Sequence, residues 1–347
     1  MMKTEIQNYP TRKGSAAMVT FTNAKGASVT LCSVGAAIAA VNVPDKDGKL
    51  ADVVIGYPEP DAYFYDGPCS GKVPGRYANR IAKGHLEVGG KEYQLAINNG
   101  PNALHGGPEG FQNQIWETRV LGDGIVEFSY KAKDGEENYP GNMEVKAVYR
   151  WSEDNVLSLD LYGKTDAETV INLTNHAYFN LAGESAGNGA DQVLWLKASR
   201  YLPTDSTLIP EGDMAPVAGT PMDFTTAHPI ADHIKDDFAA LNYGKGYDNC
   251  WVIDDYEPGK EQTVAVMEDP KTGRKLEVIT DQPAVQVYTG NYLGGSPVGK
   301  SGRSYEDYDA VAIECQDMPD APNHPNFPST LLRPGEEYHR VIRFKFS

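Results

Sequence analysis

Short strand-like segments, each bounded by turn signals, recur along the whole chain. Apolar and other residues alternate in segments such as 27–33 and 275–280, and turn pairs such as Asp-Gly at 123–124 separate neighbouring segments. Further segments of this kind lie at 16–20, 50–55, 84–88, 91–95, 125–131, 143–151, 156–162, 192–198, 263–267, 284–288, 309–314 and 338–346. Only 226–233 and 236–242 have a plausible helical period. Regularly spaced strands without intervening helices predict an all-β fold, in which antiparallel sheets stack as a sandwich.

No feature of the sequence marks a boundary between domains. A chain of 347 residues is long enough for one large domain or two ordinary ones. It contains no internal repeat, no Gly/Ser-rich linker and no break in composition. We therefore expect a single domain over 1–347, larger than the usual β-sandwich.

The charge balance narrows the classes of partner. With 31 Lys and Arg against 48 Asp and Glu, the formal net charge is −17. A nucleic-acid-binding protein needs a basic surface, and an anionic membrane repels an acidic one, so we expect neither partner. The longest apolar stretch, 34–41, is too short to span a bilayer. The expected partner is a neutral small molecule.

The cysteines and the N-terminal segment indicate a compartment. The four cysteines are far apart in the sequence, which argues against a zinc site or a disulfide framework and favours reduced, buried thiols. The first fourteen residues show neither an apolar core nor a small-residue cleavage site, as a signal peptide would. We expect a cytoplasmic protein.

One carboxylate stands out among the many acidic residues. The apolar run 310–313 ends in Glu314, and strand alternation puts Val311 and Ile313 on one face and Ala312 and Glu314 on the other. Burying a carboxylate is costly unless it is paired or functional. The proline-rich stretch that follows, to 329, could wall a cleft.

Other candidate residues lie in polar stretches between the strands. His105 precedes two glycines in 98–111, and His176 lies among Asn and Thr residues in 170–183. Either histidine could instead be a buried structural residue. The loop 73–84 carries Arg76, Asn79 and Arg80, which fits an ordinary surface loop or an arginine fork directed at ligand oxygens. Asp248 is expected in a polar turn, and Gln286 shares a strand face with Tyr288.

A constellation of His and Glu residues fits two chemistries. One is proton transfer between a base and an acid; the other is glycoside hydrolysis, which normally needs a second carboxylate. The sequence contains no GxSxG turn, no HExxH metal motif and no GxGxxG after a strand. We therefore expect no metal and no cofactor.

Six segments together resemble the aldose 1-epimerase family, the galactose mutarotases. They are GRYANRIAKG at 75–84, NALHGG at 102–107, NLTNHAYFNLAG at 172–183, GYDNCW at 246–251, QPAVQVYTGN at 282–291 and AIECQDMPDAPNHPNFPS at 312–329. They follow the family's order. The resemblance implies an unusually large β-sandwich with a sugar cleft on one sheet, and interconversion of the α and β anomers of free hexoses without a cofactor.

The same resemblance implies roles for individual residues. Glu314 corresponds to the family's general base, His176 to its general acid and His105 to a second active-site histidine. The positions implied to contact the sugar are Asn79, Arg80, Tyr178, Asp248 and Gln286. In this mechanism the ring opens to an aldehyde, the bond beside the carbonyl carbon rotates, and the ring closes from the other face.

Alternatives to a mutarotase of free hexoses remain open at this stage. A hexose 6-phosphate 1-epimerase would need an additional basic pocket. A non-catalytic carbohydrate-binding module on the same scaffold would lack the acid or the base, and both are present. A glycosidase would need a second carboxylate beside Glu314. The preferred sugar is left open, and we expect a monomer or a weak dimer.

Overall fold

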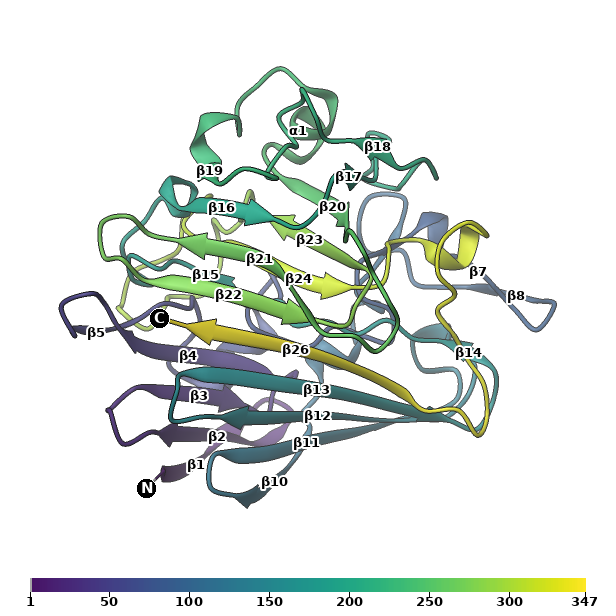
Figure 1. The fold of residues 1–347 in the computed structure, drawn as a ribbon. Coiled ribbons are helices and arrows are strands. Elements are labelled where there is room, and N and C mark those ends of the chain that lie inside the picture. Colours follow the sequence, from purple (N-terminus) through teal and green to yellow (C-terminus); the bar gives the residue numbers. More distant parts are fainter. Residues whose placement is uncertain (1) are drawn as a thin grey trace.

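The protein, described here by a computed structural model of residues 2–347, is built almost entirely from antiparallel strands (Figure 1). Its largest sheet contains nine strands. In spatial order they are β10 (Glu117–Gly122), β11 (Ile125–Ala132), β12 (Met143–Trp151), β13 (Val156–Thr165), β26 (Tyr338–Phe346), β22 (Lys275–Thr280), β21 (Gln262–Glu268), β16 (Val193–Leu196) and β19 (His228–Pro229). The last strand of the chain, β26, therefore joins the two halves of this sheet.

Two further sheets pack against the largest one. The five-stranded sheet has the order β1 (Lys3–Thr11), β2 (Gly14–Thr22), β3 (Ser28–Cys32), β4 (Ala37–Pro44) and β5 (Leu50–Asp52). The six-stranded sheet has the order β15 (Tyr178–Phe179), β24 (Val311–Gln316), β23 (Ala284–Tyr288), β20 (Asp248–Val252), β17 (Arg200–Tyr201) and β18 (Ala215–Pro216). Two-stranded pairs join β14 (Thr169–Val170) to β25 (Leu331–Leu332), β6 (Arg80–Ile81) to β9 (Ala103–Leu104), and β7 (His85–Val88) to β8 (Lys91–Gln94).

The main core lies between these sheets and follows from strand alternation. In β13, Leu157, Leu159 and Leu161 are buried in the main hydrophobic cluster. The intervening Ser158 and Asp160 point to the opposite face, where arginine and histidine side chains contact them. The same cluster takes apolar residues from all three large sheets. The sheets therefore pack against one another through their apolar faces, and this packing holds the site in place.

The predicted all-β sandwich is confirmed, and the differences are local. The helix predicted at 226–233 is wrong, because this segment forms β19 and a short 3₁₀ turn, Ile230–Asp232. Pro229 explains the difference, since it has no N–H to donate within a helix. The helix predicted at 236–242 forms later, as α1 (Ala239–Gly244).

Other differences concern strands, and β4 and β10 also lie outside the segments expected from the sequence. Asp248, which we expected in a turn, is the first residue of β20. β1 was not predicted, because nearly all of its side chains are exposed and no face alternates. It forms through pairing with β2 along its whole length.

Two general expectations can be compared with the structure. No helix among the described residues is long and apolar enough to cross a bilayer. Cys32, Cys69, Cys250 and Cys315 are all free and buried, as expected.

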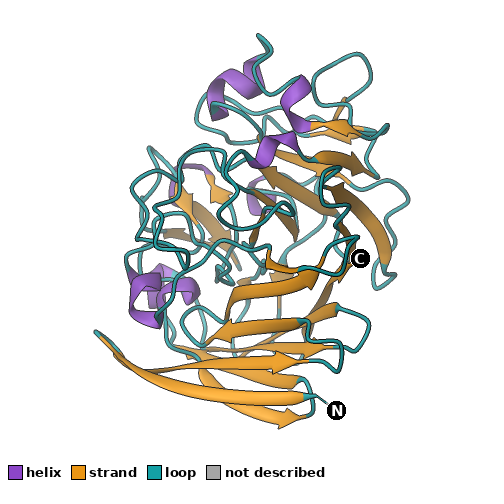
Figure 2. Cartoon of the chain, turned by 90° about the vertical axis from the view of Figure 1, so that its left-hand side faces the viewer, coloured by secondary structure: helices purple, strands orange, loops and turns teal. Residues whose placement is uncertain are grey.

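Long loops crowd one side of the molecule next to the strands (Figure 2). Those that join the strands of the six-stranded sheet, together with the loops around β6 and β9, supply the walls of a cavity. The sheet supplies its floor through β24, β23 and β20.

Candidate active site

The cavity over the six-stranded sheet has a volume of about 720 Å³. Ligand pockets for small molecules commonly have volumes of about 300–1,000 Å³. Seven of the eight residues singled out from the sequence line it: Asn79, Arg80, His105, His176, Tyr178, Asp248 and Glu314. Segments distant in the sequence thus meet at one site, as the sequence motifs predicted.

Glu314 projects into the cavity from β24. The alternation expected from the sequence holds, because Val311 and Ile313 enter the main core while Ala312 packs on the opposite side. Glu314 is only 2% exposed, and its Oε2 has no hydrogen-bond partner. Burial raises the pKa of this carboxyl well above its usual range; nearby Asp248 adds to the rise.

His176 lies directly against that carboxyl group. Its Nε2 is 3.4 Å from Oε1 of Glu314, and its Nδ1 is buried without a partner. Burial lowers the pKa of His176 to about 4. Both shifts favour the uncharged form of each group.

His105 has a fixed tautomer. The backbone N–H of Asn79 donates to Nδ1 of His105 over 3.1 Å, so the neutral ring carries its hydrogen on Nε2. The ring stands nearly perpendicular to that of His176, with 5.2 Å between centroids. Burial, followed by the charge of His176, lowers the pKa of His105 well below its usual value. His105 is therefore a neutral hydrogen-bond donor.

Two residues of the site have strained backbone. His105 and Asn79 have φ angles of 53° and 65°, in the left-handed region that non-glycine residues seldom adopt. Such conformations cost about 1–3 kcal/mol each and are retained mainly where surrounding structure enforces them, often at ligand sites. The reciprocal contacts between the two residues hold this arrangement, because the N–H of His105 also donates to the Asn79 carbonyl.

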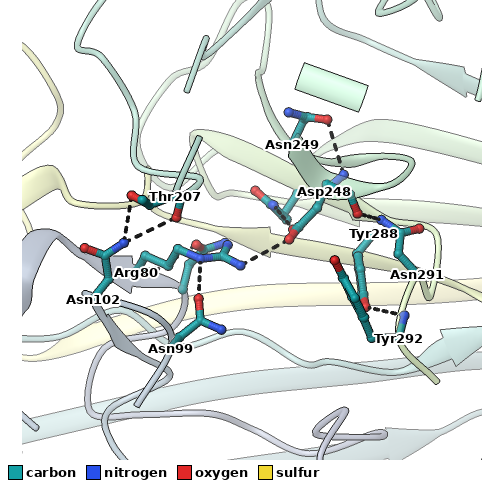
Figure 3. A network of polar contacts seen from close by, with 12 residues as sticks. Arg80, Asn99, Asn102, Thr207, Asp248, Asn249, Tyr288, Asn291 and Tyr292 are labelled. Atoms are coloured by element: carbon teal, nitrogen blue, oxygen red, sulfur yellow. Dashed lines mark hydrogen bonds and ion pairs between the residues drawn. The ribbon is translucent and has the colours of Figure 1, made fainter. Parts of the chain in front are cut away.

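A polar network on the other wall fixes a guanidinium group (Figure 3). Nε of Arg80 donates to Oδ1 of Asn99 over 3.0 Å, and Nη2 lies 3.2 Å from Oδ2 of Asp248. Nε2 of Gln286 donates to Oδ1 of the same aspartate over 2.7 Å. Gln286 is 3% exposed and does not line the cavity, so in this structure it reaches the site only through Asp248.

Aromatic rings supply the apolar surfaces of the site. The ring of Tyr178 lies 4.9 Å from that of His176, and its hydroxyl donates to the carbonyl of Pro68. Tyr288 lies on β23, on the other side of β24 from Tyr178, and the more exposed Tyr292 lies at the rim. Such rings can cover the apolar face of a sugar.

The sequence did not identify every residue of the site. Asn99 lay inside a segment we singled out but was not itself a candidate. The loop 206–208 and the glycine-rich turn 294–296 also line the cavity, and neither carried a recognisable signal. Conversely, Arg76 is buried away from the cavity and donates to the carbonyls of Pro140 and Gly141. Its role is structural.

Within residues 2–347, no group of three or more His, Cys, Asp or Glu side chains is arranged to hold a metal ion.

Comparison with known proteins gives consistent matches over nearly the whole chain. The sequence profile of the family described as aldose 1-epimerase matches residues 17–345. The chain is 44% identical over 320 residues to the galactose mutarotase of Homo sapiens, covering 92% of this chain and 91% of that protein. It is 36% identical over 332 residues to the aldose 1-epimerase of Escherichia coli, covering 95% and 94%.

Solved structures agree with these matches. An aldose epimerase homologue from C. elegans superposes with a TM-score of 0.88 at 32% identity, covering 96% of this chain and 99% of that one. A galactose 1-epimerase from Lactobacillus acidophilus gives a TM-score of 0.87 at 27% identity, covering 100% and 99%.

Proposed function

The chain belongs to the aldose 1-epimerase family and interconverts the α and β anomers of aldose sugars; on this premise we propose which of its residues carry the reaction. The observation that carries the proposal is the contact between Glu314 and His176 at the floor of the cavity. Ring opening requires the anomeric hydroxyl to lose a proton and the ring oxygen to gain one. A base and an acid side by side meet that requirement.

The carboxylate of Glu314 accepts the proton of the anomeric hydroxyl, and the imidazolium of His176 donates one to the ring oxygen. The bond between C1 and the ring oxygen breaks, and an aldehyde forms. After rotation beside the carbonyl carbon, the aldehyde oxygen takes the proton back from Glu314 and the former ring hydroxyl returns its proton to His176. Each positioned transfer accelerates a reaction by roughly 10²–10⁴-fold.

Binding of the sugar must also ionise Glu314 and protonate His176. Burial favours neutral His176 and protonated Glu314. Sugar hydroxyls that donate to Glu314 stabilise the carboxylate, and the proton then passes to His176 across the 3.4 Å contact. Substrate binding therefore prepares the two groups for the forward step.

The remaining candidates hold the sugar rather than make or break bonds. Arg80 and Asp248 present a donor and an acceptor to adjacent hydroxyls, with Gln286 supporting the aspartate. His105 donates from Nε2, while Asn79 fixes its tautomer and also lines the cavity. Holding one end of the sugar while the carbonyl end rotates lowers the entropic cost of ring closure.

The lining favours a neutral sugar over a phosphorylated one. Among the residues that line the cavity, Arg80 is the only Lys or Arg, and it is already paired with Asp248. A phosphate would enter beside two carboxylates without an unpaired cation to receive it. The presence of both the base and the acid favours an enzyme over a non-catalytic binding module.

A polarimetric panel tests this function. Fresh α-galactose, α-glucose and other aldoses are dissolved with and without the protein, and the approach to the anomeric equilibrium is followed. We expect faster mutarotation of at least one free hexose. Binding of a sugar without any acceleration would contradict the assignment and favour the non-catalytic module.

We also propose that residues 1–347 act as one domain, because the site and the main core draw on residues from both halves of the chain. The four free, buried cysteines support a reducing compartment, the cytoplasm.

We propose a monomer or weak dimer, which sedimentation at several protein concentrations would test.

A further inference from the structure

A buried ion pair that the mechanism does not use lies beneath the active site. Nζ of Lys72 is 3.4 Å from Oδ2 of Asp66, and the two side chains are 1% and 0% exposed. Removing two charges from water is costly, and a buried pair by itself is weak grounds for a stabilising role.

Hydrogen-bond partners surround both members of the pair. Asp66 accepts hydrogen bonds from the hydroxyl of Tyr57 (2.5 Å), the backbone N–H of Ser70 (2.6 Å) and the hydroxyl of Ser70 (3.1 Å). Lys72 donates to the carbonyl of Tyr63 over 2.7 Å. A carboxylate with this many donors, facing an ammonium group with its own acceptor, is a fixed dipole in the protein interior.

This dipole is adjacent to both active-site histidines. The N–H of His176 donates to the carbonyl of Lys72, and the N–H of Gly71 donates to the carbonyl of His176, each over 2.9 Å. A second cavity of about 400 Å³ is lined by Asp66, Lys72 and His105 together. The pair and His105 therefore border the same cavity, and the backbone of His176 is bonded directly to Lys72 and to Gly71 beside it.

We propose that Lys72 and Asp66 are a positioning pair that sets the protonation state of each of the two active-site histidines. This inference rests on the proposed roles of those histidines. The Lys72 cation disfavours a charge on His105, which keeps that ring a neutral donor. The Asp66 anion opposes the same cation at His176, so that His176 can take up the proton that the reaction requires. In a poorly solvated interior such charges act over several ångströms.

Other charged and titratable groups also face the histidines. Around His176 they are His105, Tyr178, Tyr288, Glu314 and Asp248, and Arg80 acts on His105. Burial is the largest cause of the lowered pKa of each histidine. Beyond it, Lys72 lowers the pKa of both, whereas Asp66 raises that of His176. The two members of the pair therefore act on His176 with opposite sign.

The two variants of the pair should shift the His176 midpoint in opposite directions. A pair with a purely structural role would not produce this result. Lys72→Met leaves the Asp66 anion uncompensated, and Asp66→Asn leaves the Lys72 cation uncompensated. Histidine ring nitrogens in ¹⁵N-labelled protein, followed by NMR across a pH series, report each midpoint directly. We expect the His176 midpoint to rise by on the order of one pH unit in Lys72→Met and to fall in Asp66→Asn.

Lys300→Met is the matched control, because Lys300 forms an ion pair with Asp52 and lines neither cavity. It should leave the histidine midpoints unchanged. Shifts in the same direction in both variants of the buried pair, or no shift in a folded Lys72→Met protein, would overturn the proposal. If one variant does not fold, the sign in the other decides.

The unmodified protein gives an independent check. His105 should remain neutral, with its hydrogen on Nε2, well below pH 6.5, and an ordinary titration of His105 would overturn the proposal. The acid limb of kcat/KM should move with the His176 midpoint in Lys72→Met. A moved midpoint with an unmoved rate profile would support the charge effect and contradict the role of His176 as the acid, so the two failures are distinguishable.

Discussion

Nε2 of His176 lies 3.4 Å from Oε1 of Glu314, and both side chains are almost completely withdrawn from solvent. Burial raises the pKa of Glu314 and lowers that of His176, which favours the uncharged form of each group. The contact brings these two titratable groups together at the floor of the cavity.

His176→Asn should lower turnover far more than it changes KM. Asparagine retains a polar side chain but cannot donate a proton at neutral pH, so the loss falls on the chemical step, by roughly 10²–10⁴-fold in kcat. Polarimetry over a range of sugar concentrations separates the two parameters. His339→Asn, on the outer face where His339 pairs with Asp160, should retain full turnover. A change confined to KM would contradict the acid role.

Asn99→Ala should weaken sugar binding without slowing the chemistry. Asn99 accepts from Nε of Arg80 while Asp248 pairs with Nη2, so both contacts fix the guanidinium at the cavity wall (Figure 3). Loss of one hydrogen bond of about 1 kcal/mol raises KM about fivefold. Measurement of kcat and KM by polarimetry checks this.

Arg80→Lys makes a useful comparison, because it retains the charge but loses the planar fork. It should raise KM more than Asn99→Ala does. If Asn99→Ala lowered kcat and left KM unchanged, Asn99 would belong to the chemical step and the positioning role would be wrong.

Glu314→Gln should stabilise the fold increasingly as the pH rises. The pKa of Glu314 is raised on folding, so the folded state binds more protons than the unfolded state above pH 4.5, and stability is lost as the pH rises from there. Glutamine removes this loss. Thermal unfolding at pH 5 and pH 8 should show a gain in Tm that is larger at pH 8. A gain that shrinks towards pH 8 would mean that the carboxylate is stabilised by the fold.

Galactose 6-phosphate should be a poor substrate relative to galactose. The only Lys or Arg in the lining is paired with Asp248, so a phosphate group would remain uncompensated. Comparative polarimetry should give a kcat/KM at least about tenfold lower for the phosphate, equivalent to about 1.4 kcal/mol. Equal or faster conversion of the phosphate would favour the hexose 6-phosphate epimerase.

The sequence predicted the layers of the fold because strand alternation is a local pattern. Leu157, Leu159 and Leu161 show this, since every second residue of β13 enters the core. β1 escaped prediction because its stability comes from pairing with β2 and not from a buried face. Pro229 disfavours a helix at 226–233, but the prediction followed the helical period of the apolar residues and was wrong.

The site was predictable only in part, for a related reason. Glu314 could be identified from burial at the end of an apolar strand, and the resemblance to a family supplied the roles of the histidines. Asn99 and Thr207 carry no comparable pattern. Thr207 is held near the site by hydrogen bonds from Asn102, a contact across more than a hundred residues that no local rule predicts.

The most direct test of the account is polarimetry of freshly dissolved α-galactose with Glu314→Gln beside the wild-type protein and Glu277→Gln. Glu277 of β22 pairs with Lys345 of β26 in the nine-stranded sheet. Its variant therefore controls for the loss of one carboxylate away from the site. The account predicts that Glu314→Gln, folded by circular dichroism, retains less than about 1% of the enzymatic rate while Glu277→Gln matches the wild type. A near-normal rate in folded Glu314→Gln would contradict the assignment of Glu314 as the base.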